Sequence, residues 1–317
     1  MKAVFLDKET FNDDIDLTAI TQQVDELICY DVTAPEDVIS RCLQAELVII
    51  NKVVLSENIL ANLPKLKLIC IAATGYNNVD LETATKHGIT VTNVSGYAGQ
   101  SVSQYVFAQI LEYYQQTSHH NKNTEKGLWQ NSRIFCYHGN AITELNDKTI
   151  AIVGYGNLGK SVEVIARAFN MRVLISERLN AKVTREGRVS FLQAIQQADI
   201  ISLHCPQTVD TEHLINTETL KQMKSNAMLI NTARGALVDD FALIHALTNN
   251  IIAYAALDVL NQEPPPENHP LLMAKLSNLK VTAHIAWASS EAQQRLIVLL
   301  GANIEAFKHG KKRNNLN

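Results

Sequence analysis

The chain has 317 residues, of which 46% are hydrophobic, and a formal net charge of −4. This length and apolar content allow about two domains, each with a substantial core. The charge balance excludes a large basic field, so we expect neither nucleic acid nor an anionic membrane as a partner.

Cysteine usage indicates a reducing compartment. The five cysteines are odd in number and include no C-x-x-C pair. We therefore expect free thiols in a cytoplasmic protein, without a disulfide framework or a bound metal. Charged residues follow Leu6, so the first apolar run is expected to be a core strand and not a signal peptide. No apolar run approaches the ~18 residues needed to span a bilayer.

In the first third of the chain, short apolar runs alternate with stretches of helical periodicity. This alternation predicts βαβ units and hence an open parallel sheet with helices on both faces. A long helical stretch is predicted from Ser101 to Gln116, after a segment of small residues at 93–99. The predicted strands are residues 4–6, 47–50, 68–72 and 90–92.

Near the middle of the chain, an apolar run at residues 150–153 leads into a G-x-G-x-x-G motif at 154–159. Gly154 permits a tight turn, and Gly156 lets the backbone approach a pyrophosphate. Gly159 lets the following helix pack closely on the strand, with its first N–H groups facing the phosphates. The motif predicts a binding site for a nicotinamide or flavin dinucleotide.

The segments around this motif agree with a dinucleotide-binding unit. A helical stretch at 158–169 is followed by an apolar run at 172–175 and by Glu177, 18 residues after the last glycine. An acidic residue in this place accepts hydrogen bonds from a ribose. The further predicted strands of this second series are residues 200–203, 227–231, 254–257 and 280–282.

Because the dinucleotide motif lies at mid-chain, we expect the first half to form a separate domain. We predict an α/β protein with two Rossmann-like or flavodoxin-like domains, each built on a parallel sheet, and an active site in the interdomain cleft. Residues 1–98 plus 288–317 would form a substrate (catalytic lid) domain, to which a last helix at 289–307 returns. Residues 99–287 would form the NAD-binding Rossmann domain.

Three loops that directly follow predicted strands carry charge in apolar surroundings: residues 231–235, 257–264 and 282–287. Open α/β sheets place their ligands at the carboxyl ends of strands. Arg234 would grip a substrate carboxylate and polarise a keto oxygen. His284 would give that oxygen its proton, while Glu263 would hydrogen-bond the imidazole and favour its protonated form. Together these groups are suited to reducing a 2-keto acid with a hydride.

With these motifs the chain resembles the D-isomer-specific 2-hydroxyacid dehydrogenase family over nearly its whole length. It is most similar to the glycerate dehydrogenase (hydroxypyruvate reductase) branch, which carries A-T-G-x-N-N-V-D and H-I-A-W. The motifs that carry the resemblance are A-A-T-G-Y-N-N-V-D at 72–80, the glycine turn, H-C-P at 204–206, N-T-A-R-G at 231–235, D-V at 258–259, E-P at 263–264 and H-I-A-W at 284–287.

The resemblance implies roles for individual residues. Arg234, Glu263 and His284 would be catalytic, with His284 as the proton donor. Asp258 would hold the nicotinamide carboxamide. The implied substrate-binding residues are Thr74, Gly75, Arg234, His284 and Trp287. The implied cofactor-binding residues are Gly154, Gly156, Asn157, Leu158, Gly159, Glu177, Arg178, His204, Cys205, Pro206, Thr232, Ala233, Arg234, Asp258, His284, Ala286 and Trp287.

Two positions depart from the common family pattern. Residues 101–105 read S-V-S-Q-Y where relatives usually show S-V-A-E-H, a change near the hinge and the subunit interface. Trp287 replaces the glycine that many members carry after H-I-G. Its indole would narrow the pocket and favour a small substrate, although a core tryptophan without ligand contact is the alternative.

Cofactor choice depends on Glu177 and Arg178. A carboxylate at this strand end accepts hydrogen bonds from the ribose 2′-hydroxyl and repels a 2′-phosphate, so Glu177 favours NAD. Arg178 is the next residue and could form an ion pair with the 2′-phosphate of NADP. We therefore expect NAD to be preferred, with partial use of NADP.

These observations predict the reduction of a small 2-keto acid, with hydroxypyruvate to D-glycerate and its reverse favoured, by a homodimer. Glyoxylate or D-lactate as the substrate is the first alternative, because the same catalytic groups serve them all. A non-catalytic NADH-sensing binding protein on the same fold is the second.

Overall fold

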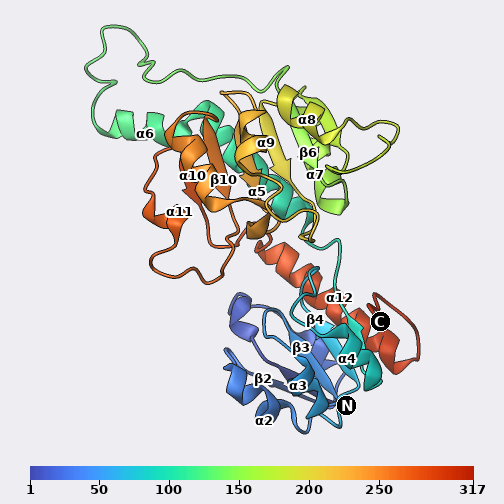
Figure 1. Cartoon of the computed structure of the whole chain (residues 1–317). Coiled ribbons are helices and arrows are strands. Elements are labelled where there is room, and N and C mark those ends of the chain that lie inside the picture. Colours follow the sequence, from blue (N-terminus) through green and yellow to red (C-terminus); the bar gives the residue numbers. More distant parts are fainter. The chain divides into compact units, whose positions relative to one another are not determined.

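The computed structural model describes residues 1–317, which divide into two compact units (Figure 1). The first comprises Met1–Ala98 and Trp287–Asn317, and the second comprises Gly99–Ala286. The second boundary therefore lies one residue before the predicted one, and Trp287 belongs to the first unit. No helix in either unit is both long and apolar enough to cross a membrane.

The first unit is built on a five-stranded parallel sheet with the order β2-β1-β3-β4-β5. Its strands are β1 (Lys2–Phe5), β2 (Glu26–Cys29), β3 (Leu47–Ile50), β4 (Leu68–Ile71) and β5 (Thr90–Thr92). Its helices are η1 (Lys8–Thr10), α1 (Thr18–Thr21), η2 (Pro35–Asp37), α2 (Val38–Cys42), α3 (Glu57–Ala61), α4 (Leu81–Lys86) and α12 (Ser290–Lys308).

The sequence did not predict β2, for a physical reason. The central strands β3 and β4 are buried at every residue, and such strands read as unbroken apolar runs. In contrast, β2 lies at the sheet edge, and its two ends, Glu26 and Cys29, are exposed. Four partly exposed residues give too short a pattern to distinguish a strand from a loop.

The second unit contains a six-stranded parallel sheet with the order β11-β10-β9-β8-β6-β7. Its strands are β6 (Thr149–Val153), β7 (Arg172–Ser176), β8 (Ile200–Leu203), β9 (Met228–Asn231), β10 (Tyr254–Leu257) and β11 (Leu279–Val281). Its helices are α5 (Gly99–Gln115), α6 (Thr117–Glu125), α7 (Asn157–Ala168), α8 (Phe191–Gln197), α9 (Thr217–Lys221), η3 (Gly235–Leu237), α10 (Asp240–Thr248) and α11 (Pro270–Met273).

The strand order reverses at β6. The chain moves outward from β6 to β7 and then returns to β8 on the other side of β6. Because such crossovers are right-handed, α7 and α8 cover opposite faces of the sheet. The same reversal occurs between β1 and β3 in the first unit. Two parallel sheets of this kind confirm the predicted α/β fold class, and ligands bind at the carboxyl ends of strands beside such a reversal.

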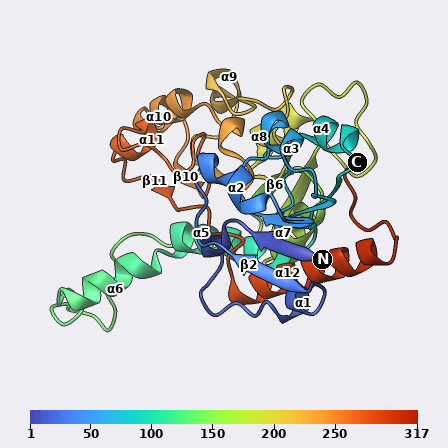
Figure 2. The ribbon, with the colours of Figure 1, turned by 90° about the horizontal axis from the view of Figure 1, so that it is seen from below.

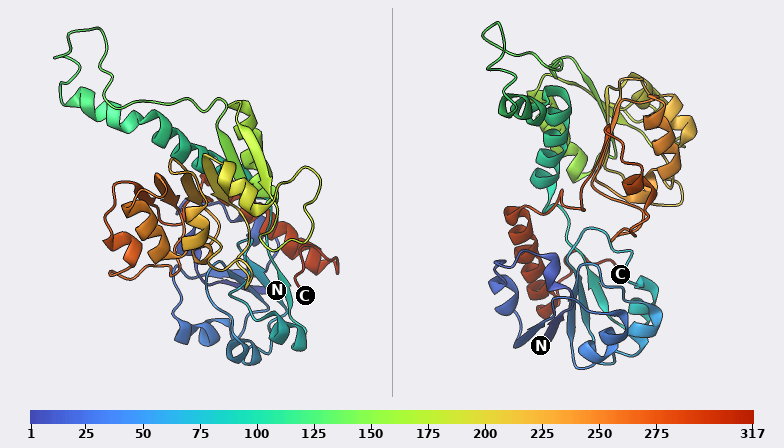
Figure 3. Two further views of the ribbon diagram at one scale, coloured as in Figure 1. Left: turned by 45° about the horizontal axis from the view of Figure 1, so that its top comes forward. Right: turned by 90° about the vertical axis from the view of Figure 1, so that its left-hand side faces the viewer.

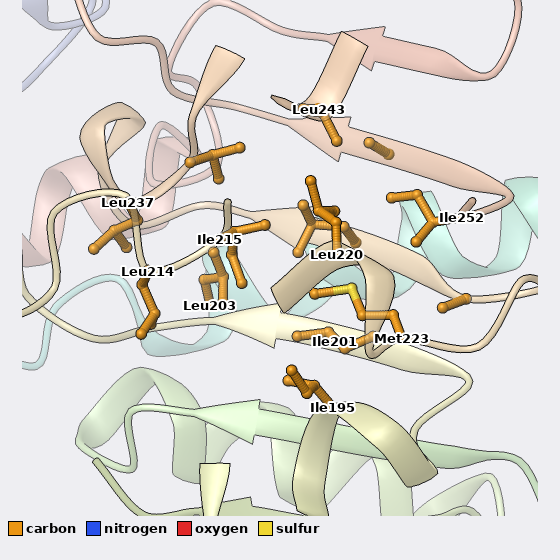
Figure 4. Close-up of a cluster of buried hydrophobic side chains, with 14 of the residues drawn as sticks. Ile195, Ile201, Leu203, Leu214, Ile215, Leu220, Met223, Leu237, Leu243 and Ile252 are labelled. Carbon is orange, nitrogen blue, oxygen red and sulfur yellow. The ribbon is translucent and has the colours of Figure 1, made fainter. Parts of the chain in front are cut away.

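A large apolar cluster fixes the sheet of the second unit (Figure 4). Ile201 and Leu203 of β8 lie in it together with Ile195 of α8, Leu220 of α9 and Leu243 of α10. Each of these side chains is at most 1% exposed. Close packing of this kind resists displacement, so the strand ends that carry the candidate site are held on a rigid support.

One part of the second unit stands apart from its sheet. Figures 2 and 3 show α6 and the loop after it extending away from the strands. We call α6 and residues 126–144 the arm. The sequence did not predict α6, because only Asn123 of this helix is buried and no apolar stripe marks a helix.

Candidate active site

The glycine turn between β6 and α7 shows which glycines the fold itself requires. Gly154 has a φ of +98°, and a Cβ atom there would lie 2.4 Å from the backbone nitrogen of Cys205. A Cβ atom on Gly159 would lie 2.3 Å from the carbonyl oxygen of Gly154. Gly156 differs, since its φ is −90° and a Cβ atom there would meet nothing within 4 Å. The open space beside Gly156 therefore fits the close approach of a ligand's pyrophosphate.

Two further features fit a bound dinucleotide. Gly156 is the N-cap of α7 and makes no side-chain capping bond, so the first N–H groups of this helix are available to phosphate oxygens. Thr232, after β9, is 8% exposed, and its buried hydroxyl has no hydrogen-bond partner. A buried polar group without a partner is costly, and a ligand could satisfy it.

The predicted H-C-P residues lie against the glycine turn. The backbone N–H of His204 donates to the carbonyl of Val153 at 2.7 Å, which continues the pairing of β8 with β6. Burial lowers the pKa of His204 to about 4 and raises the pKa of the Cys205 thiol to about 11. Both side chains are therefore neutral near pH 7. They can line the glycine turn with uncharged groups and do not supply acid–base chemistry.

Asn231 at the end of β9 shapes the loop that carries Arg234. Its side-chain oxygen accepts from the Ala233 N–H at 3.0 Å, and its amide nitrogen donates to the Arg234 carbonyl at 2.8 Å. The Arg234 guanidinium donates to the carbonyl of Ala233 at 2.6 Å and forms no ion pair. An unpaired guanidinium in this position retains donors for an anionic ligand.

Gly235 brings the loops after β9 and β10 together. A Cβ atom at this position would lie 2.0 Å from the carbonyl carbon and 2.2 Å from the carbonyl oxygen of Leu260. The contact is therefore possible only without a side chain. Leu260 lies three residues before Glu263, so this glycine sets the approach of the Arg234 loop to the Glu263 loop. No role for Gly235 was predicted, since its backbone neighbour Leu260 follows a different strand.

The structure brings the predicted pair of Glu263 and His284 together. The imidazole Nδ1 lies 2.7 Å from Glu263 Oε2, and the other carboxylate oxygen accepts from the Leu260 N–H at 2.9 Å. The side chains are 23% exposed for His284 and 34% for Glu263, so a ligand can reach them. With Nδ1 engaged, Nε2 is the nitrogen that can present a proton to a ligand.

Asp258, at the end of β10, holds the loop that carries His284. Its carboxylate is buried, and its Oδ1 accepts from the Thr282 hydroxyl at 2.6 Å and the Ile285 N–H at 2.9 Å. The other oxygen accepts from the Ala286 N–H at 2.8 Å. The Asp258 carbonyl also accepts from the His284 N–H at 2.7 Å. These bonds fix His284 although its φ of +55° is unfavourable for a non-glycine residue.

The sequence did not indicate this role for Asp258. The hydroxyl of Tyr105, on α5, extends the network through a hydrogen bond to Thr282. Tyr105 ends the S-V-S-Q-Y segment that departs from the family pattern, so the departure puts a tyrosine behind the His284 loop. Whether Asp258 also contacts a nicotinamide carboxamide stays a prediction.

Glu177, at the end of β7, is not a free carboxylate. It is 3% exposed and forms a bidentate ion pair with Arg185, at 2.7 Å from Nε and 2.6 Å from Nη2. Its Oε1 also accepts from the Arg178 N–H at 3.0 Å. These donors lower the pKa of Glu177 to about 2, with the hydrogen bonds from Arg185 as the largest cause. Sequence reasoning missed Arg185, because an irregular loop gives no periodic signal of its pairing.

The predicted residues of the first unit are held by local contacts. The Thr74 hydroxyl donates to the Val94 carbonyl at 2.9 Å, and the side chain of Asn93 donates to the Thr74 carbonyl at 2.7 Å. The indole of Trp287 packs edge-on against Phe11 and Tyr97, with ring centroids 5.7 and 6.3 Å apart. Trp287 thus has a packing role within the first unit. Substrate contacts of Thr74, Gly75 and Trp287 stay predictions.

The contrast between Gly154 and Gly156 gives a test of the dinucleotide site. Gly154→Ala should destabilise the protein by about 1–3 kcal/mol, because the new Cβ atom meets backbone at a positive φ. Gly156→Ala should leave the melting temperature unchanged but weaken NADH binding by about tenfold or more, equivalent to about 1.4 kcal/mol. Thermal unfolding and a fluorescence titration with NADH measure the two effects. Unchanged NADH affinity in Gly156→Ala would contradict a pyrophosphate beside this residue.

Comparisons with known proteins agree with this geometry. Residues 107–286 match the family model described as D-isomer specific 2-hydroxyacid dehydrogenase, NAD binding domain. The chain is 40% identical over 314 residues to the glycerate dehydrogenase of Methylorubrum extorquens, covering 99% of this chain and 98% of that protein. It is 33% identical over 323 residues to the glyoxylate reductase of Aeropyrum pernix, covering 99% of this chain and 95% of that protein.

Solved structures share the fold over the whole chain. An acyclic imino acid reductase in complex with NADPH and D-Arg gives a TM-score of 0.86 at 29% identity, covering 100% of both chains. The D-lactate dehydrogenase of Aquifex aeolicus, complexed with NAD and lactic acid, gives a TM-score of 0.83 at 28% identity, covering 99% of this chain and 98% of that one. The chain belongs to the D-isomer-specific 2-hydroxyacid dehydrogenase family of NAD-binding oxidoreductases.

Proposed function

We propose that the chain reduces a small 2-keto acid to the D-2-hydroxy acid with NADH or NADPH, with hydroxypyruvate as the favoured substrate. The observation that carries this proposal is the bond of 2.7 Å between Glu263 and His284, on loops that meet the loop of an unpaired Arg234. A cation, an oriented imidazole and a supporting carboxylate are the groups that the reaction requires.

Each side chain has one role in binding the substrate or transferring the proton. Arg234 binds the substrate carboxylate through a pair of N–H donors and polarises the keto oxygen. His284 holds its acid proton on Nε2 and transfers it to that oxygen, so that the carbonyl becomes a hydroxyl. Glu263 accepts from Nδ1 and keeps the ring oriented for the transfer. Thr74 and Gly75 bind the carboxylate with backbone N–H groups.

Cofactor binding depends on the glycine turn and on the uncharged side chains of His204 and Cys205 after β8. The nicotinamide supplies the hydride when the cofactor is bound. Asn157 and Leu158 hold the pyrophosphate at the start of α7, while Thr232 and Ala233 contact the cofactor from the β9 loop. The similar reductase was solved with NADPH and the similar D-lactate dehydrogenase with NAD, so we propose that both forms bind. The expected preference for NAD assumed a free Glu177, whereas this carboxylate is ion-paired.

Hydroxypyruvate is favoured over glyoxylate and pyruvate by the glycerate dehydrogenase relative and by the H-I-A-W motif at 284–287. Glyoxylate is the second candidate, since another relative over the same length is named glyoxylate reductase. A non-catalytic NADH sensor is disfavoured because Arg234, Glu263 and His284 are all retained and two of them are in contact. We also propose a cytoplasmic location.

A panel of 2-keto acids tests this proposal. Hydroxypyruvate, glyoxylate and pyruvate are each assayed with NADH and with NADPH, following cofactor absorbance. We expect the highest kcat/KM with hydroxypyruvate and a D-configured product. A higher kcat/KM with glyoxylate would replace the substrate assignment, and dinucleotide binding without turnover of any of the three acids would favour the sensor.

We further propose that the chain forms a homodimer through the arm. Five large hydrophobic side chains of the arm are between 41% and 90% exposed. Five exposed apolar side chains between residues 129 and 142 are unusual on a monomer and typical of an interface. The arm is ordered internally, because Trp129 donates to the Phe135 carbonyl at 2.9 Å and Ser132 donates to the Cys136 carbonyl at 2.7 Å. The exposed residues are Trp129, Ile134, Phe135, Tyr137 and Ile142.

Light scattering coupled to size exclusion tests the assembly. We expect a mass of about twice the 35.2 kDa of one chain, and a shift toward the monomer mass for Phe135→Asp. Val209→Asp is the matched control, since Val209 is 94% exposed in the same unit but outside the arm, and Phe135 is 90% exposed. A monomeric parent protein would contradict the homodimer, and an equal shift in both variants would contradict the arm as its interface.

A further inference from the structure

The end of β7 carries an excess of positive charge. Residues 177–188 contain Arg178, Lys182, Arg185 and Arg188 against two acids, Glu177 and Glu186, so their net charge is +2 (4 − 2). A site selective for NAD through a carboxylate would be expected to present negative charge to the ribose. Here the charge balance favours an anionic group instead.

Glu177 is buried, and the side chain of Arg185 that pairs with it is exposed. The side chain of Glu177 is 3% exposed, whereas that of Arg185 is 57% exposed. An approaching ligand therefore meets the guanidinium before it meets the carboxylate. Since the pKa of Glu177 is lowered to about 2, the pair keeps both charges at any pH near neutrality.

The hydrogen bonds of Glu177 also leave Arg185, and not the carboxylate, available to a ligand. The Glu177 carboxylate accepts from Nε and Nη2 of Arg185 and from the Arg178 backbone N–H. Little acceptor capacity remains for a ribose hydroxyl, because a carboxylate offers about four acceptor sites. Arg185 keeps the N–H donors that do not face Glu177, and a phosphate binds such donors in bidentate fashion.

Arg188 connects this cluster to the glycine turn. Its guanidinium lies 5.8 Å from the ring centroid of Tyr155, the residue between Gly154 and Gly156. Its Nε is also 3.9 Å from Glu177. The arginines therefore lie beside the loop proposed to hold the pyrophosphate, at the strand end where an adenosine ribose would lie.

We propose that Arg185 determines cofactor selectivity: by covering and neutralising Glu177, it makes the adenosine end of the site accept the 2′-phosphate of NADP(H), assisted by Arg178 and Arg188. This inference rests on the cofactor-binding part of the proposed function and not on the identity of the keto acid. It assigns to Glu177 the role of holding Arg185, in place of repelling the phosphate.

Calorimetric titration with ADP-ribose and 2′-phospho-ADP-ribose isolates this end of the cofactor. We expect the parent protein to bind the phosphorylated ligand at least as tightly as the other. Arg185→Ala should weaken binding of 2′-phospho-ADP-ribose by about 10- to 100-fold and leave ADP-ribose binding equal or tighter, because Glu177 is then free to meet the 2′-hydroxyl. Arg185→Lys, which keeps the charge but loses the fork, should give an intermediate ratio.

Lys182→Ala is the matched control, since it removes one positive charge from the same loop without removing a partner of Glu177. It should leave the ratio of the two affinities unchanged. If Arg185→Ala fails to fold because Glu177 is left buried and unpaired, the double variant Glu177→Gln/Arg185→Ala removes both charges and should show the same loss of phosphate affinity.

The measurements distinguish a wrong role for Arg185 from a wrong cofactor site. An unchanged ratio in Arg185→Ala or in the double variant, or an equal change in Lys182→Ala, would overturn the role of Arg185 and leave the proposed function intact. A parent protein that binds neither ligand, nor NADH, would overturn the cofactor site itself.

Discussion

The buried carboxylate of Asp258 is the constraint on which the candidate active site depends. It accepts hydrogen bonds from Thr282, Ile285 and Ala286 and so ties the end of β11 to the end of β10. A buried charge is stable only when it is fully hydrogen-bonded, which makes this arrangement specific. The result is a His284 held in a left-handed conformation with its imidazole against Glu263. The fold itself therefore holds His284 in contact with Glu263.

The strand order places the proposed determinant of cofactor selectivity and the proposed proton donor at different edges of one sheet. β7, with the Glu177–Arg185 pair, and β11, followed by His284, are the opposite edges of one six-stranded sheet. Five strand spacings of about 4.8 Å place these edges about 24 Å apart. The glycine turn after β6 and the loops after β8, β9 and β10 lie between them. Substitutions at the β7 edge are therefore expected to leave the contact between Glu263 and His284 unchanged.

Local patterns predicted the fold and named most residues of the candidate site. The glycine turn and the buried strands are local features, and the charged loops after β9, β10 and β11 pointed to Arg234, Glu263 and His284. The missed features have no periodic pattern in the sequence. Arg185 lies eight residues from Glu177 in an irregular loop, and the Asp258 partners follow another strand. β2 is a short, half-exposed edge strand, and α6 lacks an apolar stripe, so neither has the pattern that identifies an element.

The role of His284 as proton donor can be measured as the rate of hydride transfer in a single turnover of the His284→Gln variant. NADH is bound first and mixed rapidly with hydroxypyruvate, and the loss of nicotinamide absorbance is followed in the variant and in the parent protein. We expect a rate lower by about 10²- to 10⁴-fold, because a general acid is removed, while NADH still binds to the variant. A rate close to that of the parent protein would contradict the assignment of His284 as the proton donor.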